Sequence, residues 1–195
     1  MIKVGLLGSP GCGKTTLAAY AFAMLKDQGI DGELINEYIR EYMNRHKRIP
    51  NITFQSVIYE RQLEKEKIVP PGLDFLITDS PHILSYIYTS LYIDYNDKDQ
   101  IELLGHLYLK FLRQSREAYD LIYLLEENHP PNMNDGVRYQ TKEEMNLLKV
   151  IIPAFLDMHH IKYTLLSADI PTKQRAHMVV DDVKKLIFDR KCKII

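Results

Sequence analysis

The sequence predicts an α/β domain with a doubly wound, five-stranded parallel sheet that carries helices on both faces. Short apolar runs, typical of buried strands, alternate along the chain with longer helical patterns. A glycine-rich turn follows the first apolar run directly and leads into a helical pattern. The 195 residues suit one domain with a lid, so we treat residues 1–195 as a single unit.

The order of the elements follows from these runs. Each predicted strand is too apolar to have one face in water, which favours the centre of a parallel sheet. The predicted strands cover residues 2–7, 33–36, 73–78, 121–125 and 162–166. The predicted helices cover residues 14–28, 37–46, 53–67, 82–117, 141–159 and 171–190, with a break near 94–99.

Local sequence signals mark two helix starts. Ser80 followed by Pro81 predicts a capping hydroxyl and a proline at the first helical position. Thr141 with Glu144 three residues later predicts a capping box.

Composition excludes several classes of protein. With 46% apolar and 26% charged residues, the chain is globular in character, and a net charge of −1 gives no overall attraction to nucleic acid or anionic lipid. Cys12 and Cys192 lie too far apart in sequence for a metal motif and suit a reducing compartment. The longest apolar stretch is too short for a membrane span. We expect a cytoplasmic protein with no membrane partner; the sequence does not predict its oligomeric state.

Residues 8–16 read GSPGCGKTT and fit the phosphate-loop pattern G-x-x-x-x-G-K-[ST]. In such a loop backbone N–H groups converge on a phosphate, Lys14 neutralises phosphate oxygens and Thr15 offers a hydroxyl to Mg²⁺. Cys12 is interpreted as a small residue that the turn tolerates. The pattern predicts ATP and Mg²⁺ as cofactors. The expected nucleotide-binding residues are Gly8, Gly11, Cys12, Gly13, Lys14, Thr15 and Thr16.

Nucleotide binding alone does not choose between a switch, a motor and a kinase. The sequence lacks an N-K-x-D guanine signature, since residues 96–99 have the wrong order, and it lacks an ABC-type signature. It is also too short for a full AAA+ ATPase with its helical subdomain. A small-molecule kinase fits best, because it needs only a core, an acceptor pocket and a lid.

Two carboxylates follow predicted strands at the edge where ligands bind in such sheets. Glu37 follows the second strand and Asp79 the third. Either could accept the proton of an acceptor hydroxyl, and which of them does so stays open. Asp79 with Thr15 is also the expected Mg²⁺ site. Arg40, one turn after Glu37, could hold an acceptor or a phosphate, with a solvated helix face as the alternative.

The long polar segment 126–140 is the predicted lid. Arg138 on this segment is expected to neutralise charge in the transition state while closure excludes water. The alternative is an ordinary β-turn at Asn134, Asp135 and Gly136 with an exposed arginine.

These residues together resemble the P-loop kinase family typified by the ribosylnicotinamide kinase domain of bacterial NAD-salvage regulators, which carries an AAA-type label although its members act as small kinases. The resemblance spans residues 1 to about 140 in the family's order. It implies the strand order 2-3-1-4-5, ATP with Mg²⁺ as donor, and an acceptor pocket drawing on Glu37, Arg40, Gln62 and the region after Asp79. The matching pieces are 8–15, Glu37, Tyr38, Arg40, Tyr42, Phe54, Gln62, Asp79, Asp135 and Arg138, with Asp135 as a further expected acceptor contact.

The segment after Asp79 departs from the family pattern, because it is rich in tyrosine. Its tyrosines could stack on a base, but their helical spacing favours packing on a neighbouring helix. His82 is interpreted as a structural residue. The tyrosines are Tyr86, Tyr88, Tyr92 and Tyr95.

The sequence thus predicts an ATP-dependent kinase that transfers the γ-phosphate to a nucleoside- or nucleotide-like acceptor. One alternative is a kinase acting on nucleic acid, at a modified base or a 5′-hydroxyl end, through basic clusters at residues 45–48 and 184–193. Another is a regulatory ATPase in which hydrolysis moves the 126–140 segment against a protein partner.

Overall fold

The computed structural model describes residues 1–46, 51–115, 118–127 and 140–192. Its core is a five-stranded parallel sheet in the order β2-β3-β1-β4-β5, which confirms the predicted fold class and strand order. The strands are β1 (Ile2–Leu7), β2 (Gly32–Ile35), β3 (Phe75–Thr78), β4 (Leu121–Leu125) and β5 (Thr164–Leu166).

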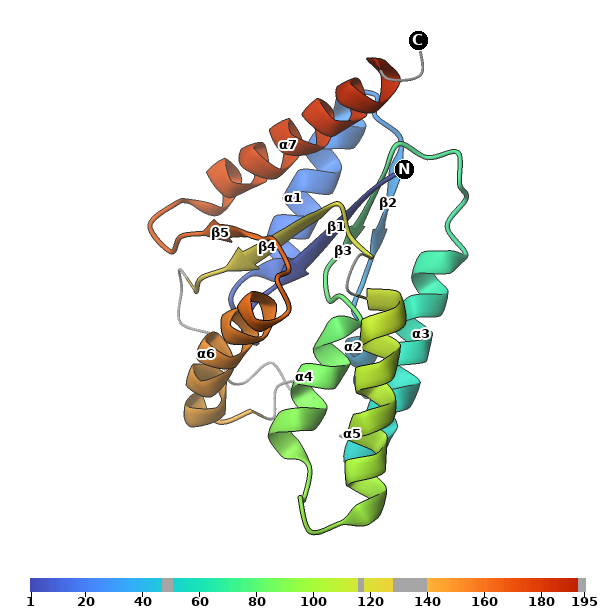
Figure 1. Cartoon of the computed structure of the whole chain (residues 1–195). Coiled ribbons are helices and arrows are strands. Elements are labelled where there is room, and N and C mark those ends of the chain that lie inside the picture. Colours follow the sequence, from blue (N-terminus) through green and yellow to red (C-terminus); the bar gives the residue numbers. More distant parts are fainter. Residues whose placement is uncertain (47–50, 116–117, 128–139, 193–195) are drawn as a thin grey trace.

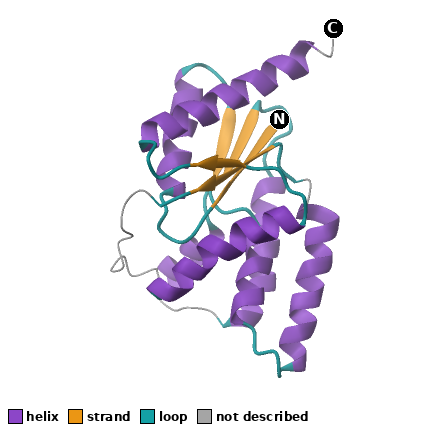
Figure 2. Ribbon diagram, turned by 60° about the vertical axis from the view of Figure 1, so that its left-hand side comes forward, coloured by secondary structure: helices purple, strands orange, loops and turns teal. Residues whose placement is uncertain are grey.

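Helices cover both faces of the sheet (Figures 1 and 2). On one face α1 (Lys14–Asp27) and α7 (Thr172–Cys192) lie side by side. The other face is covered chiefly by α4 (Ile83–Tyr92) and α6 (Lys142–Met158). The remaining helices are α2 (Tyr38–His46), α3 (Gln55–Lys67), which follows a 3₁₀ turn at Ile52–Phe54, and α5 (Lys98–Lys110), which runs into a π-helical turn at Phe111–Ser115.

Alternation along β1 divides the apolar core into two layers. Val4 and Leu6 are buried against α1 and α7, whereas Leu7 belongs to the cluster formed with α4 and α6. Burial on both faces explains why the central strands are continuous apolar runs in the sequence. None of the helices in the part of the chain described above has the length and apolarity that a bilayer span requires.

The observed helix boundaries test the capping and helix-break predictions made from the sequence. Thr141 and Glu144 form the predicted capping box at the start of α6. The predicted break between α4 and α5 is present, and Asp97 caps α5. The prediction for Ser80 and Pro81 is wrong: His82 occupies the N-cap position of α4, and the Ser80 hydroxyl instead donates to Glu37 Oε1 at 3.3 Å. A partner from the neighbouring strand end has replaced the local cap.

Candidate nucleotide and acceptor site

The 8–16 turn joins β1 to α1 in a conformation that depends on glycine. Gly11 and Gly13 have φ angles of 84° and 95°, in the left-handed region where a side chain is strained, and Gly13 is the N-cap of α1. Gly8 has φ 148°, and a Cβ there would lie 2.6 Å from Cys12 Sγ and 2.8 Å from the Leu125 carbonyl oxygen. The turn therefore brings the backbone close to β4 and directs the N-terminus of α1 toward the strand edge.

Lys14 folds back over this turn. Its ammonium donates to the carbonyl oxygens of Gly8 at 3.0 Å and Ser9 at 3.1 Å. These carbonyls hold the positive charge beside the helix N-terminus, where backbone N–H groups and the helix dipole also favour an anion. The turn is thus a ready anion-binding site.

Thr15 and Asp79 bring together two oxygen-bearing groups. The Thr15 hydroxyl donates to Asp79 Oδ2 at 2.6 Å. Asp79 is buried, and its Oδ1 has no hydrogen-bond partner among the described residues. Hydroxyl and carboxylate oxygens are ligands that suit Mg²⁺, which commonly completes its coordination with phosphate and water. The pair therefore fits the predicted metal.

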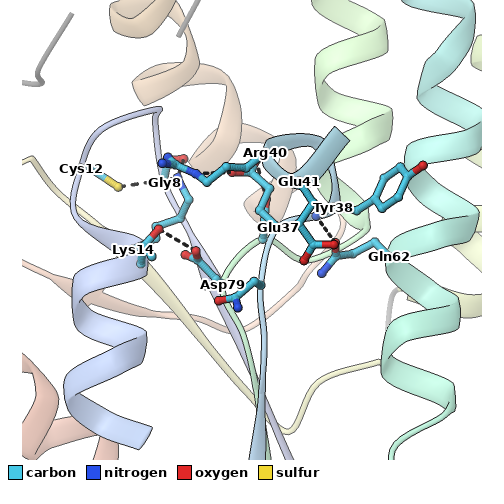
Figure 3. A network of polar contacts seen from close by, with 12 residues as sticks. Gly8, Cys12, Lys14, Glu37, Tyr38, Arg40, Glu41, Gln62 and Asp79 are labelled. Carbon is cyan, nitrogen blue, oxygen red and sulfur yellow. Dashed lines mark hydrogen bonds and ion pairs between the residues drawn. The ribbon is translucent and has the colours of Figure 1, made fainter. Parts of the chain in front are cut away.

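The sheet itself brings Glu37 to Asp79. Ile35 pairs with Thr78 in the β2–β3 register, and the Asp79 N–H donates to the Ile35 carbonyl oxygen at 3.0 Å. The two carboxylates that follow these strands consequently lie at the same edge. Figure 3 shows Glu37 between Asp79 and Arg40.

Glu37 sits in a mixed electrostatic environment. Burial raises the pKa of its carboxyl above the ordinary 4.5; the Lys14 cation opposes this rise, Asp79 adds to it, and Arg40 and the Ser80 hydrogen bond again oppose it. Arg40 Nε lies 3.8 Å from Glu37 Oε2. A carboxylate with a raised pKa beside a phosphate-binding turn is suited to accepting a proton.

Helix α2 is held against α3 around Gln62. The Tyr38 N–H donates to Gln62 Oε1 at 2.9 Å, which fixes the amide so that its Nε2 is a donor. Gln62 is buried, and within the described ranges this Nε2 has no hydrogen-bond partner. Lys65 reinforces the contact, since it donates to the Asn36 carbonyl oxygen at 2.8 Å and pairs with Glu41.

A single cavity of about 410 Å³ joins these groups. It runs from the phosphate-loop residues Lys14 and Thr15, past Glu37 and Arg40, to Gln62, His82 and Tyr88. Its volume falls within the range of small-molecule sites, roughly 300 to 1,000 Å³.

The structure thus brings most of the predicted site residues together, with some exceptions. Gly11, Gly13, Lys14, Thr15, Thr16, Glu37, Arg40 and Gln62 line the cavity, and Asp79 reaches it through Thr15. Cys12 is buried in the core instead, so only its backbone belongs to the turn. Asp135, Arg138 and most of the 126–140 segment lie outside the described residues.

The region after Asp79 contributes to the cavity wall, as the family resemblance implies, but the sequence did not assign individual residues of that wall. His82, interpreted as structural, borders the cavity, as do Gln55 and Met43. Of the four tyrosines after Asp79, Tyr88 borders it, whereas Tyr86 packs among aromatic rings of the core and Tyr95 is exposed. His82 lies only three residues after Asp79, and this short separation could have identified it as a cavity residue.

Several solved structures share the fold of this chain. One is a NadR protein in complex with NR, with 21% identity and a TM-score of 0.69 over 94% of this chain and 51% of that chain. Another is the deoxyadenosine kinase from M. mycoides, with dATP bound (16% identity, TM-score 0.65) or with the products dCMP and dCDP (14%, 0.63). These two structures align over 94% and 95% of this chain and all of theirs.

The fold and the phosphate loop define a protein with the P-loop kinase architecture. The sequence profile of the AAA domain family matches residues 3–175, so the chain belongs to that family. No curated protein matches it.

Proposed function

We propose that this protein is an ATP-dependent kinase that transfers the γ-phosphate to a hydroxyl group of a nucleoside- or nucleotide-like acceptor. The observation that carries the proposal is the continuous cavity that joins Lys14 and Thr15 to Glu37, Arg40 and Gln62. A hydrolytic switch needs a nucleotide site alone, whereas a kinase needs room for a second molecule beside the terminal phosphate. The NR and deoxynucleotides present in the similar structures support an acceptor of nucleoside type.

The proposed reaction is an in-line displacement. The acceptor oxygen forms a bond to the γ-phosphorus while the bond between that phosphorus and the β,γ-bridging oxygen breaks, and ADP leaves. The hydroxyl proton passes to Glu37. We assign the base to Glu37 because Asp79 Oδ2 already accepts the Thr15 hydroxyl, which favours a metal-binding role for Asp79.

The other residues bind and orient. Lys14 would exchange its carbonyl partners for phosphate oxygens, and Arg40 beside Glu37 would hold the acceptor or a phosphate. Thr15 and Asp79 would hold Mg²⁺, which supplies charge neutralisation on the phosphates. Arg138 is proposed to add a further positive charge from the lid.

Transfer of labelled phosphate tests the proposal directly. The protein is incubated with Mg²⁺ and γ-labelled ATP, together with ribosylnicotinamide, deoxynucleosides, nucleoside monophosphates or DNA with a 5′-hydroxyl end. We expect label on a nucleoside or a nucleotide. Label on DNA alone would favour the nucleic-acid kinase, and acceptor-independent release of phosphate would favour the regulatory ATPase; either result overturns the proposal.

Substitution of Asp79 tests its proposed metal-binding role, and substitution of an exposed tyrosine serves as the control. Asp79→Asn keeps the size of the side chain and a hydrogen-bond acceptor for Thr15, but removes the charge that the metal needs, so kcat should fall about 100-fold or more. Tyr95→Phe is the matched control, since the Tyr95 side chain is exposed and bonds only the Ser90 carbonyl oxygen in the described structure. Its rate should equal that of the unmodified protein.

A further inference from the structure

A buried polar network adjoins the acceptor end of the cavity and has no part in the chemistry described so far. It consists of Glu66 on α3, His82 at the N-cap of α4, and Tyr119, just before β4. The Tyr119 hydroxyl lies 2.7 Å from Glu66 Oε1 and 2.9 Å from His82 Nδ1, and His82 Nδ1 lies 3.5 Å from Glu66 Oε1. Glu66 and His82 are 3% and 2% exposed.

The network determines which ring nitrogen of His82 carries the proton. Burial, together with the nearby Glu66 carboxylate, holds the pKa of Tyr119 well above its ordinary value, so this residue stays a phenol with one proton to donate. Tyr119 uses this hydrogen to donate a hydrogen bond to Glu66 Oε1. The Tyr119 oxygen is then an acceptor toward His82, and Nδ1 must carry the hydrogen. In the neutral ring, Nε2 is left with a lone pair.

His82 Nε2 has no partner to match that lone pair. Within the residues that the structure describes, this buried atom makes no hydrogen bond. A buried polar atom without a partner is costly, typically by about 1 to 3 kcal/mol. His82 also borders the same cavity as Gln62, whose Nε2 is a buried donor without a described partner.

We propose that His82 Nε2 is a specificity-determining contact that accepts a hydrogen bond from an amino or amide N–H group on the base of the acceptor. Glu66 and Tyr119 are positioning residues that hold the ring in the required tautomer. This inference rests on the proposed kinase function and narrows the acceptor class to bases that present an N–H donor, such as adenine, cytosine or a ring carboxamide.

Pairs of nucleosides that differ only in this N–H group give the test. They are deoxyadenosine and purine deoxyriboside, deoxycytidine and its 4-deamino analogue, and ribosylnicotinamide and its 3-acetylpyridine counterpart. For the pair that the protein phosphorylates, we expect kcat/KM to fall about tenfold or more when the N–H group is missing, because the lone pair of His82 then stays unmatched.

Substitutions of His82 test the same contact by changing the protein instead of the substrate. His82→Asn keeps a donor near the Nδ1 position for Tyr119 but removes Nε2, so both members of the pair should react with similar kcat/KM. His82→Gln places an amide oxygen near the Nε2 position and should retain part of the preference. Tyr119→Phe should also reduce the preference, since the ring is then free to change tautomer. If His82 had a purely structural role, its substitution would lower kcat/KM for both members of a pair by the same factor.

Each result separates this inference from the proposed function. If no nucleoside or nucleotide in the wider acceptor panel takes up label, the kinase proposal fails and the inference falls with it. If another acceptor is labelled but none of these nucleosides reacts, only the inference is overturned. If the protein phosphorylates both members of a pair equally, or if His82→Asn keeps the preference, the inference alone is overturned. ATP affinity by calorimetry serves as the folding control and should be unchanged in the His82 variants. Should His82→Asn not fold, the wild-type pair and His82→Gln still decide: an equal pair, or a His82→Gln preference identical to wild type, contradicts the inference.

Discussion

At the scale of single residues, Glu37 carries a pH dependence that can be measured. Its pKa is raised above 4.5, chiefly by burial, while the Lys14 and Arg40 cations lower it. If Glu37 is the base, it works only when ionised, so kcat/KM should fall as the pH drops through this raised pKa. Arg40→Met removes one cation and should shift the acid limb to higher pH, whereas Arg40→Lys should shift it less.

Ionisation of Glu37 should affect stability in the opposite direction from activity. A carboxyl whose pKa is raised on folding favours the folded state at low pH, and that contribution is lost as the pH rises through the folded pKa. Glu37→Gln resembles the protonated form. It should abolish turnover yet unfold at a higher urea concentration than the wild type at pH 8, with the difference shrinking toward pH 4. Equal urea midpoints for the wild type and Glu37→Gln at both pH values would contradict a raised pKa at this half-buried carboxyl.

At the scale of elements, the sequence predicts the parts whose signals are local. Parallel strands buried on both faces give continuous apolar runs, and the phosphate loop is contiguous, so both can be recognised from short segments. The Glu66–His82–Tyr119 network joins residues up to 53 positions apart, and only packing brings them together. Ser80 failed as a cap for the same reason, because a residue 43 positions away supplies a competing partner.

Helix α5 offers a stability prediction with a clear local cause. Gly105 lies within this helix, is exposed, and a Cβ added there would meet nothing within 4 Å. Gly105→Ala should therefore stabilise the fold by about 0.5 to 1 kcal/mol, since alanine loses less backbone entropy in a helix. Urea unfolding followed by circular dichroism measures the change, and turnover should stay the same.

The capping box of α6 gives a change of opposite sign. The Glu144 N–H donates to Thr141 Oγ1 at 3.2 Å, and Glu144 in turn accepts from the Thr141 N–H at 2.6 Å. Thr141→Ala should cost about 0.5 to 2 kcal/mol, whereas Thr141→Ser should cost much less because it keeps the hydroxyl. Equal unfolding midpoints for the Ala and Ser variants would show that the cap contributes nothing.

At the scale of the whole molecule, the distribution of charge disfavours a nucleic-acid partner. The net charge is −1, and basic residues in the second half of α7 already contact acceptors on the same chain. Arg190 donates to the Met1 carbonyl oxygen and pairs with Asp120, and Lys184 donates to Gln28 Oε1. Cations that are engaged in this way release few counterions on DNA, so a small, salt-dependent patch is the most that this helix provides.

The nucleotide site should couple to the stability of the whole fold, because its residues come from β1, α1, and the ends of β2 and β3. A ligand that binds only the folded state at 100 times its Kd stabilises it by about 2.7 kcal/mol. For a domain of this size, that corresponds to a rise in Tm of about 5 to 10 °C. ATP with Mg²⁺ should produce such a rise in the wild type.

Lys14→Ala should remove most of this rise in Tm. Its Tm without ligand should stay close to that of the wild type, since Lys14 bonds only carbonyls and a sulfur of its own turn within the described structure. An equal rise in Lys14→Ala would mean that the nucleotide binds somewhere other than this turn.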